Sequence, residues 1–163
     1  MANIQEAPGD YHTKIIISMN SNNIICSGAI VYSLNTQRFL FLHRVKGRSG
    51  KLWGLVGGTT EAAETPWEGL QREIFEEIGE ITIKKTMPLE TFVSNDSRFR
   101  FHTYLCVVDK EFMPTLNDEH DGYAWVNFGM WPKPLHHGLH NTLKNKVNVD
   151  KLKTVFKVID LLD

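Results

Sequence analysis

Three glutamates are spaced along the chain as neighbouring side chains on a helix would be. Glu73, Glu76 and Glu77 fall within residues 65–78, TPWEGLQREIFEEI. At about 100° per residue, their carboxylates project side by side over an arc of roughly 100°. Like charges at this spacing repel one another, so the helix needs a compensating positive group. A divalent cation such as Mg²⁺ compensates well, because it prefers oxygen ligands and leaves room for water and phosphate.

An acidic helix face that is simply exposed to water would show the same three carboxylates, and the flanking residues help to decide between the two. Arg72 lies beside the cluster, Glu64 comes one residue before the start of the helix, and Gly57 and Gly58 form a tight turn upstream. A solvated face needs none of these features. Together they favour a metal site over a solvated face.

The helix that would carry the carboxylates has clear signals at both ends. Thr65 can cap its N-terminus, Pro66 suits the first helical position, and Glu68 completes a capping box. Gly79 is a natural C-terminal stop. The residues predicted to face the core share one narrow arc and are Trp67, Leu70, Ile74 and Ile78.

The remaining elements predict an α/β protein with a mixed sheet. β-branched and alternating patterns predict strands at 24–33, 38–44, 53–56, around 81–93, 99–108 and 123–128. Two further helices are predicted near 138–146 and at 151–162, the second with an apolar face of Leu152, Val155, Ile159 and Leu162. Strands, a helix, more strands and then helices indicate a mixed α/β sandwich and not a regular βαβ repeat.

Length, charge and composition narrow the class of protein. The chain of 163 residues predicts one domain over 1–163, with residues 1–20 expected to be partly disordered. A net charge of -1 provides no field for holding long nucleic acid. Cys26 and Cys106 are expected to be buried, reduced thiols, and no apolar run is long enough for a membrane span or a signal peptide. A cytoplasmic protein is therefore expected.

The segment from Gly58 to Gly79 resembles the Nudix box, G-x5-E-x7-R-E-U-x-E-E-x-G-U, in which U is a bulky apolar residue. The residues that match it at the required spacing are Gly58, Glu64, Arg72, Glu73, Ile74, Glu76, Glu77 and Gly79. Agreement at this many fixed positions is a specific signal. The sequence departs from the pattern at Glu80, where the final apolar residue would stand and where Ile81 can take its packing role. It departs again at Val56, where many members have proline.

The resemblance implies a Nudix-type α/β/α sandwich and a metal-dependent hydrolase that cuts a phosphoanhydride bond. It implies Mg²⁺ as the cofactor, with Mn²⁺ able to substitute, and protein ligands at the Gly58 carbonyl, Glu73, Glu76 and Glu77. Such a metal would polarise the diphosphate and lower the pKa of the attacking water. Glu64 and Arg72 would brace the loop and helix, and Arg72 would also neutralise part of the acidic cluster.

A second acidic segment, NDEHD at 117–121, precedes the last predicted strand. In the family that the chain resembles, a glutamate in this loop often joins the metal or acts as the base, which makes Glu119 the candidate here. The alternative is an ordinary polar turn. His120 is a weaker candidate for the base because histidine titrates near neutral pH.

Candidates for binding the substrate come from three places. Arg44 ends the second predicted strand, and Lys46 and Arg48 follow it in a basic loop that could equally be a solvated surface. His137, within a histidine-rich stretch that includes His136 and His140, could contact substrate or simply cap and pack the following helix. The aromatic residues that could stack on a base, or equally belong to the core, are Phe101, Tyr104 and Trp125.

The expected partner is a small nucleotide substrate, and three substrate groups remain open. The first is a nucleoside diphosphate joined to a sugar or a second nucleotide, which we favour modestly. The second is a nucleoside triphosphate, including oxidised deoxynucleotides, and the third, the 5′ end of RNA, is weakened by the lack of a long basic stripe. A catalytically inactive binding module would show eroded carboxylates, which are intact here. The oligomeric state stays open between a monomer and a homodimer.

Overall fold

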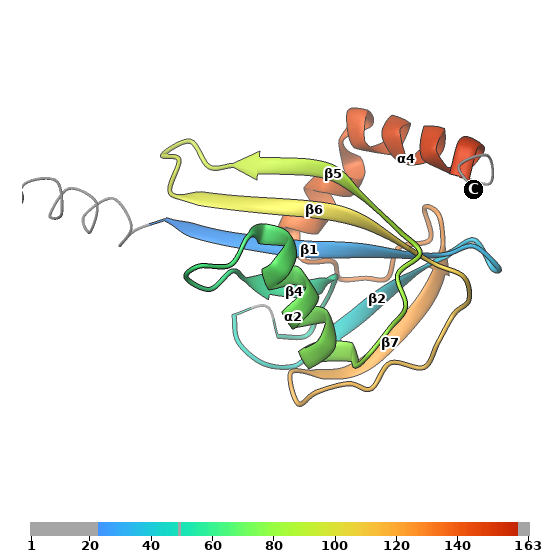
Figure 1. Ribbon diagram of the computed structural model, residues 1–163, viewed down its shortest axis with the longest axis horizontal. Helices are drawn as coiled ribbons and strands as arrows, with labels where there is room; N and C mark the ends of the chain where they lie inside the picture. Colours follow the sequence, from blue (N-terminus) through green and yellow to red (C-terminus); the bar gives the residue numbers. More distant parts are fainter. Residues whose placement is uncertain (1–22, 49, 160–163) are drawn as a thin grey trace, which may run out of the picture.

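A mixed sheet of seven strands forms the centre of the computed structural model, which describes residues 23–48 and 50–159 (Figure 1). The strands are β1 (Ile24–Ser33), β2 (Arg38–Arg44), β3 (Leu52–Gly54), β4 (Val56–Thr59), β5 (Lys85–Val93), β6 (Phe99–Val108) and β7 (His120–Asn127). They run in the order β3-β2-β1-β6-β5, with β4 paired to β1 and β7 paired to β2. The pair β1–β6 is parallel, and the other pairs of described strands are antiparallel, which confirms the mixed sheet.

Strand β1 is the hub of this sheet, because it pairs with β2, β4 and β6. Its C-terminal half is buried on both faces, which explains the nearly continuous apolar run in its sequence. Ile30 points into the core on one side of the sheet, and its neighbour Val31 points into the core on the other. Strand β1 therefore joins its three partner strands into one sheet.

Helices cover both faces of the sheet. Helix α2 (Pro66–Ile78) lies against β1 and β4, and α3 (His137–Lys144) and α4 (Lys146–Val158) pack on the opposite side (Figure 1). The core beneath α2 includes Leu70, Ile74 and Ile78, as the helical periodicity predicts. The core beneath α4 includes Phe39, Phe41 and Leu152. This confirms the predicted α/β/α sandwich.

The structure corrects several predicted boundaries. The strand predicted at 53–56 is two strands, because the chain leaves β2 after Gly54 and pairs with β1 from Val56 onward. The strand predicted around 81–93 begins at Lys85, and the one predicted at 123–128 begins at His120. The last helix begins at Lys146 and not at 151, directly after α3 ends. The predictions for residues 1–20 and Leu162 fall outside the described residues.

Residues that depart from the expected pattern have plain structural roles. Val56, which stands where many Nudix proteins have proline, is 2% exposed and lies in the core beneath α2. Ile81 packs against the same core next to the exposed Glu80, as expected.

Cys26 and Cys106 are free thiols, but only Cys106 is buried, and its burial raises the pKa to about 12. In the described part of the chain, no helix combines the length and apolar character needed to cross a bilayer.

A buried polar network joins the two C-terminal helices to the sheet. Glu90 on β5 accepts hydrogen bonds from Thr142 Oγ1 at 2.7 Å and from Asn148 Nδ2 at 2.8 Å. Asn148 is 3% exposed and also donates to the Thr142 carbonyl at 3.1 Å. One carboxylate thus fixes the junction of α3 and α4 against the edge strand.

We therefore expect Asn148→Ala to lower the free energy of unfolding by about 1–3 kcal/mol, because it leaves a partly buried carboxylate without one of its donors. Chemical denaturation monitored by circular dichroism measures the change. Thr154→Val is the matched control, since it removes an exposed hydroxyl on α4 that donates only to a carbonyl of its own helix. A cost equal to that of the control would show that the network contributes nothing.

Candidate active site

The start of α2 sets the rotation of its acidic face. Thr65 Oγ1 accepts from the Glu68 N–H at 3.2 Å, and the Glu68 carboxylate accepts from the Thr65 N–H at 2.7 Å. This is the predicted capping box, and Gly79 ends the helix as predicted with a φ of 85°. With both ends fixed and Leu70 in the core, Glu73 and Glu77 face the chain that precedes the helix.

Gly57 and Gly58, which the sequence predicted as a tight turn, lie in strand β4 paired with β1, and they leave space for these carboxylates. A Cβ on Gly58 would lie 2.5 Å from the Glu73 Cδ, so any side chain there would displace that carboxylate. Gly57 has a φ of 149°, and a Cβ on it would lie 2.1 Å from the Ser27 carbonyl oxygen on β1. The Gly57 N–H donates to Glu77 Oε2 at 2.9 Å. Gly57 therefore permits the close approach of β4 to β1, and Gly58 permits the Glu73 carboxylate of α2 to lie against β4.

Two of the helix carboxylates are removed from water. Glu77 is 3% exposed, and burial raises its pKa to about 8, with the charges of Glu73 and Glu119 adding to the effect. Burial also raises the pKa of Glu73, against the lowering effect of its hydrogen bond from Arg72. Among the described residues, no lysine or arginine forms an ion pair with Glu77. The site consequently carries a buried carboxylate without a counter-charge in contact.

Arg72 braces the site by binding the helix and the loop before it. Its Nε donates to Glu64 at 2.8 Å and its Nη1 to Glu73 at 2.9 Å, while its Nη2 donates to the Thr59 carbonyl at 3.0 Å. The contact to Glu76 is longer, at 3.3 Å, and the Glu76 side chain is 52% exposed. The predicted pairing of Arg72 with Glu64 is thus present, and Glu76 is the least enclosed carboxylate of the three.

The loop before β7 brings Glu119 to the same place. Asn117 N–H donates to the Glu77 carbonyl at 3.3 Å, which fastens this loop to the end of α2. Glu119 lies close enough for its charge to raise the pKa of both Glu73 and Glu77. Its neighbour His120 is 7% exposed, and burial lowers its pKa. Glu119, with a side chain 38% exposed, is the better placed of the two to meet a water molecule.

The predicted substrate-binding residues are only partly gathered at this site. Arg44 donates from Nη2 to Glu119 Oε2 at 2.6 Å, so it lies at the carboxylates. Lys46 pairs with Asp118 in the neighbouring loop, and Arg48 is exposed. His137 is exposed at the start of α3.

The histidine stretch has a structural role at its first member. His136 caps α3 by accepting from the Gly138 N–H at 3.2 Å, and its own N–H donates to the Trp53 carbonyl on β3 at 2.8 Å. Burial lowers the His136 pKa, and the charge of Arg44 contributes to that shift. For His136 the structure therefore shows the capping role that was the alternative to substrate contact.

Besides the pairs Arg44–Glu119 and Lys46–Asp118, the site has a third pair of polar side chains that the sequence did not predict. His43 Nδ1 lies 2.5 Å from Asp121 Oδ1, and its ring packs 5.0 Å from the ring of Trp53. The pair forms because β2 and β7 are antiparallel, with a bulge between His43 and Arg44. Only the register of two strands distant in sequence could have revealed it.

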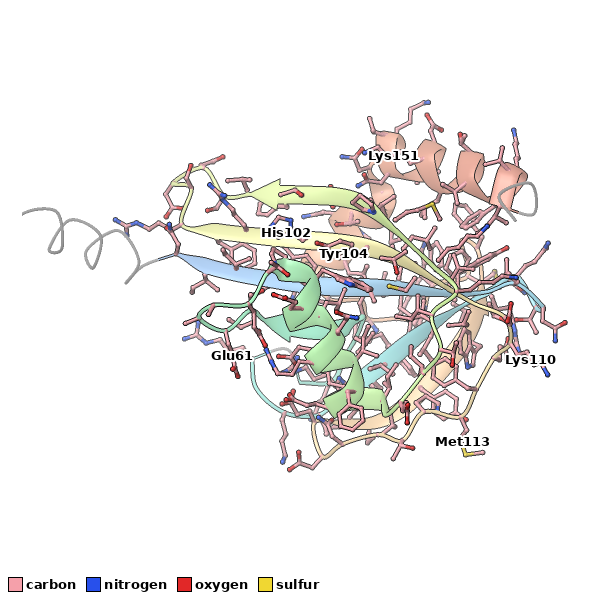
Figure 2. The ribbon with its side chains drawn as sticks, viewed as in Figure 1. Glu61, His102, Tyr104, Lys110, Met113 and Lys151 are labelled. Carbon is pink, nitrogen blue, oxygen red and sulfur yellow. The ribbon has the colours of Figure 1, made fainter. Side chains whose placement is uncertain are left out.

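Two of the three aromatic candidates belong to the core. Tyr104 packs on Trp67 of α2 with ring centroids 5.3 Å apart, on the α2 side of β6 (Figure 2). Trp125 donates its indole N–H to the Phe112 carbonyl at 3.1 Å and packs edge-on against that ring. Phe101 is half-buried on the other face of the sheet, over Gly28. The core interpretation therefore holds for Tyr104 and Trp125.

The donor set suits a hard divalent cation. It offers carboxylate oxygens from Glu73, Glu77 and Glu119, the Gly58 backbone beside them, and an excess of negative charge around buried Glu77. As placed, however, no three His, Cys, Asp or Glu side chains of the described ranges are arranged to hold a metal ion. Glu73 is held by Arg72, Glu77 by the Gly57 N–H, and Glu119 by Arg44. Binding a cation would therefore require the carboxylates to exchange these partners.

Known proteins resemble this chain in sequence. The NUDIX domain family model matches residues 25–145. The dihydroneopterin triphosphate diphosphatase of Haemophilus influenzae is 30% identical over 114 residues, which is 60% of this chain and 70% of that protein.

Solved structures share the fold. A Nudix hydrolase from M. smegmatis, RenU, superposes with a TM-score of 0.64 at 20% identity, covering 85% of this chain and 88% of that one. A MutT NUDIX hydrolase from Burkholderia pseudomallei gives 0.59 at 22% identity, covering 76% and 98%. At this level of identity, the likeness describes the fold alone.

Because Arg72 joins Glu64, Glu73 and the Thr59 carbonyl, Arg72→Ala should lower both stability and activity. We expect a loss of about 1–3 kcal/mol in the free energy of unfolding, since several charged acceptors lose their donor together. Denaturant titration and turnover measured on the same preparation check this. Arg38→Ala is the control. It breaks an ion pair with Glu111, whose atoms are 2.6 Å apart, and this pair lies outside the site. Unchanged stability with lost activity would contradict the bracing role.

A second expectation concerns the Gly58 backbone. Gly58→Ala should weaken Mn²⁺ binding by about tenfold or more, corresponding to about 1.4 kcal/mol, because the new Cβ displaces the Glu73 carboxylate. Isothermal titration calorimetry measures the dissociation constant. Gly54→Ala is the matched control, since a Cβ there would meet no atom within 4 Å. Equal affinities of the two variants would show that the position of Glu73 does not matter for the cation.

Proposed function

The chain belongs to the Nudix family and is a hydrolase of pyrophosphate bonds, and we propose that it requires a divalent metal and acts on a nucleotide-like triphosphate. The observation that supports the metal requirement is the gathering of Glu73, Glu77 and Glu119 around Gly57 and Gly58 of β4. Three carboxylates and a backbone carbonyl provide the hard oxygen ligands that Mg²⁺ or Mn²⁺ prefers. Glu76, more exposed, would complete the set from the outer side of the helix.

The substrate class is chosen from the comparisons. The sequence modestly favoured a nucleoside diphosphate linked to a sugar or second nucleotide, and no described contact selects that group. The relative at 30% identity is named as a triphosphate diphosphatase, which supports the triphosphate alternative. The proposed reaction is attack of water on phosphorus, with breakage of an anhydride bond and release of pyrophosphate and a monophosphate.

Each part of the site has a proposed role in this reaction. A bound cation would neutralise phosphate charge and make the phosphorus easier to attack. Arg44 binds phosphate oxygens, for which the planar guanidinium is well shaped. Glu119, the half-exposed carboxylate at the site, would help to hold the cation, and its second oxygen would accept the proton of the attacking water. Arg72 holds Glu73 and Glu64 in place throughout.

A panel of substrates tests the proposed function. Dihydroneopterin triphosphate, nucleoside triphosphates, nucleotide sugars and dinucleotides are incubated with Mg²⁺, with Mn²⁺ and with a chelator, and the phosphorus products are separated. We expect triphosphates to yield pyrophosphate and a monophosphate, and the chelator to abolish turnover. Preferred cleavage of nucleotide sugars or dinucleotides would instead support a nucleoside diphosphate joined to a sugar or a second nucleotide as the substrate. Full turnover without metal would refute the mechanism.

Glu77→Gln should lower kcat by about 100-fold or more, equivalent to about 2.7 kcal/mol of barrier, with no loss of thermal stability. The amide can still accept the Gly57 hydrogen bond, and the substitution removes a buried charge from a repelling cluster. Parallel measurement of kcat and Tm separates the two effects. Glu80→Gln, the same substitution at an exposed position just past the helix, is the control. Near-normal turnover of the Glu77 variant would exclude it as a metal ligand.

A further inference from the structure

Glu119 forms an ion pair with Arg44, the arginine that is proposed to bind substrate phosphate. Arg44 Nη2 and Glu119 Oε2 are 2.6 Å apart, and the two side chains are 37% and 38% exposed. A guanidinium at this distance places a positive charge where a divalent cation would approach the carboxylate. The same guanidinium is the group proposed to bind substrate phosphate. Its Nε already donates to the Lys46 carbonyl at 3.1 Å, so a phosphate held in the paired geometry competes with Glu119 for Nη2.

The backbone around this pair is fastened independently of it. The Val45 N–H donates to the Glu119 carbonyl at 2.8 Å, and the Glu119 N–H donates to Asn117 Oδ1 at 3.1 Å. On either side, Lys46 pairs with Asp118 and His43 pairs with Asp121. Breaking the Arg44–Glu119 pair would therefore free the Glu119 side chain without releasing the loop, while Arg44 Nε still donates to the Lys46 carbonyl at 3.1 Å. Glu119 could turn toward Glu73 and Glu77 by side-chain rotation alone.

We propose that Arg44 is a positioning residue that withholds Glu119 from the metal site until a substrate phosphate takes over its guanidinium. This inference rests on the proposed function. The ion pair is partly exposed and hence individually weak. A polyphosphate carries several charges and offers oxygens in the paired geometry that a guanidinium binds best, so it displaces the single carboxylate.

The exchange couples substrate binding to metal binding. Released Glu119 approaches the carboxyl groups of Glu73 and Glu77 beside Gly57 and Gly58, and a cation shared among them makes that approach favourable. Phosphate on Arg44 and metal on Glu119 thus strengthen one another, and the coupling acts equally in both directions. In the protein without substrate, Glu119 contributes little to metal affinity, because it is paired with Arg44.

Mn²⁺ titration of the substrate-free protein tests this by calorimetry on wild type, Arg44→Gln, Glu119→Gln and the double variant. We expect Arg44→Gln to tighten Mn²⁺ binding about three- to tenfold, because Glu119 becomes available. Glu119→Gln should leave the wild-type affinity nearly unchanged, and the double variant should lose the gain. Lys46→Gln is the control for charge, since it removes a positive charge from the same loop while leaving Glu119 paired. It should not tighten binding.

Other outcomes overturn the proposal. An unchanged affinity in Arg44→Gln, or an equal gain in the double variant or in Lys46→Gln, would mean that Arg44 acts only through its general field or not at all. If wild type binds Mn²⁺ and turns over substrate in those cases, the proposed function stands and the positioning role alone fails. If wild type binds no Mn²⁺ and needs none, both fail. Thermal melts confirm folding, and Arg44→Met provides a second variant that also removes the pair.

Discussion

A carboxylate in the interior of a protein raises the free energy of the folded state unless protons, donors or cations compensate it. Glu77 is such a group, and among the described residues the Gly57 N–H is the hydrogen-bond donor to its carboxylate. The surrounding features follow from this constraint. The glycines of β4 let the backbone reach it, Arg72 neutralises Glu73 next to it, and the loop before β7 is hydrogen-bonded to its backbone. Burial raises the Glu77 pKa to about 8, so a proton compensates the carboxylate near neutral pH.

The sequence specified those parts of the site that depend on local spacing. The capping box and the arc of carboxylates lie at one helix, where helical periodicity determines which side chains meet, whereas the Arg72–Glu64 pair was implied by the family resemblance. The order of the elements predicted a mixed α/β sandwich, and the resemblance added the α/β/α layering. Glu119 could be placed near the helix only through the family resemblance, because 40 or so intervening residues erase any local pattern.

What the sequence could not provide depends on strand pairing. The division of residues 52–59 into two strands, and the meeting of His43 with Asp121, are consequences of which strand lies beside which. The ion pair between Arg44 and Glu119 has the same origin, since β2 and β7 are neighbours by register and not by sequence. Partners of this kind decide whether a carboxylate is free or occupied, which composition and motif spacing leave unspecified.

The parallel pairing of β1 with β6 also sets an order of assembly during synthesis. The segments that are close in sequence and can associate early are strands β1, β2 and β4 and helix α2. Strand β6 is synthesised later, and only then can it pair along the full length of β1. Contacts between distant segments form slowly because the entropy of closing the loop opposes them. Until β6 arrives, one edge of β1 presents unpaired backbone groups, the part of the nascent chain most open to pairing with another molecule.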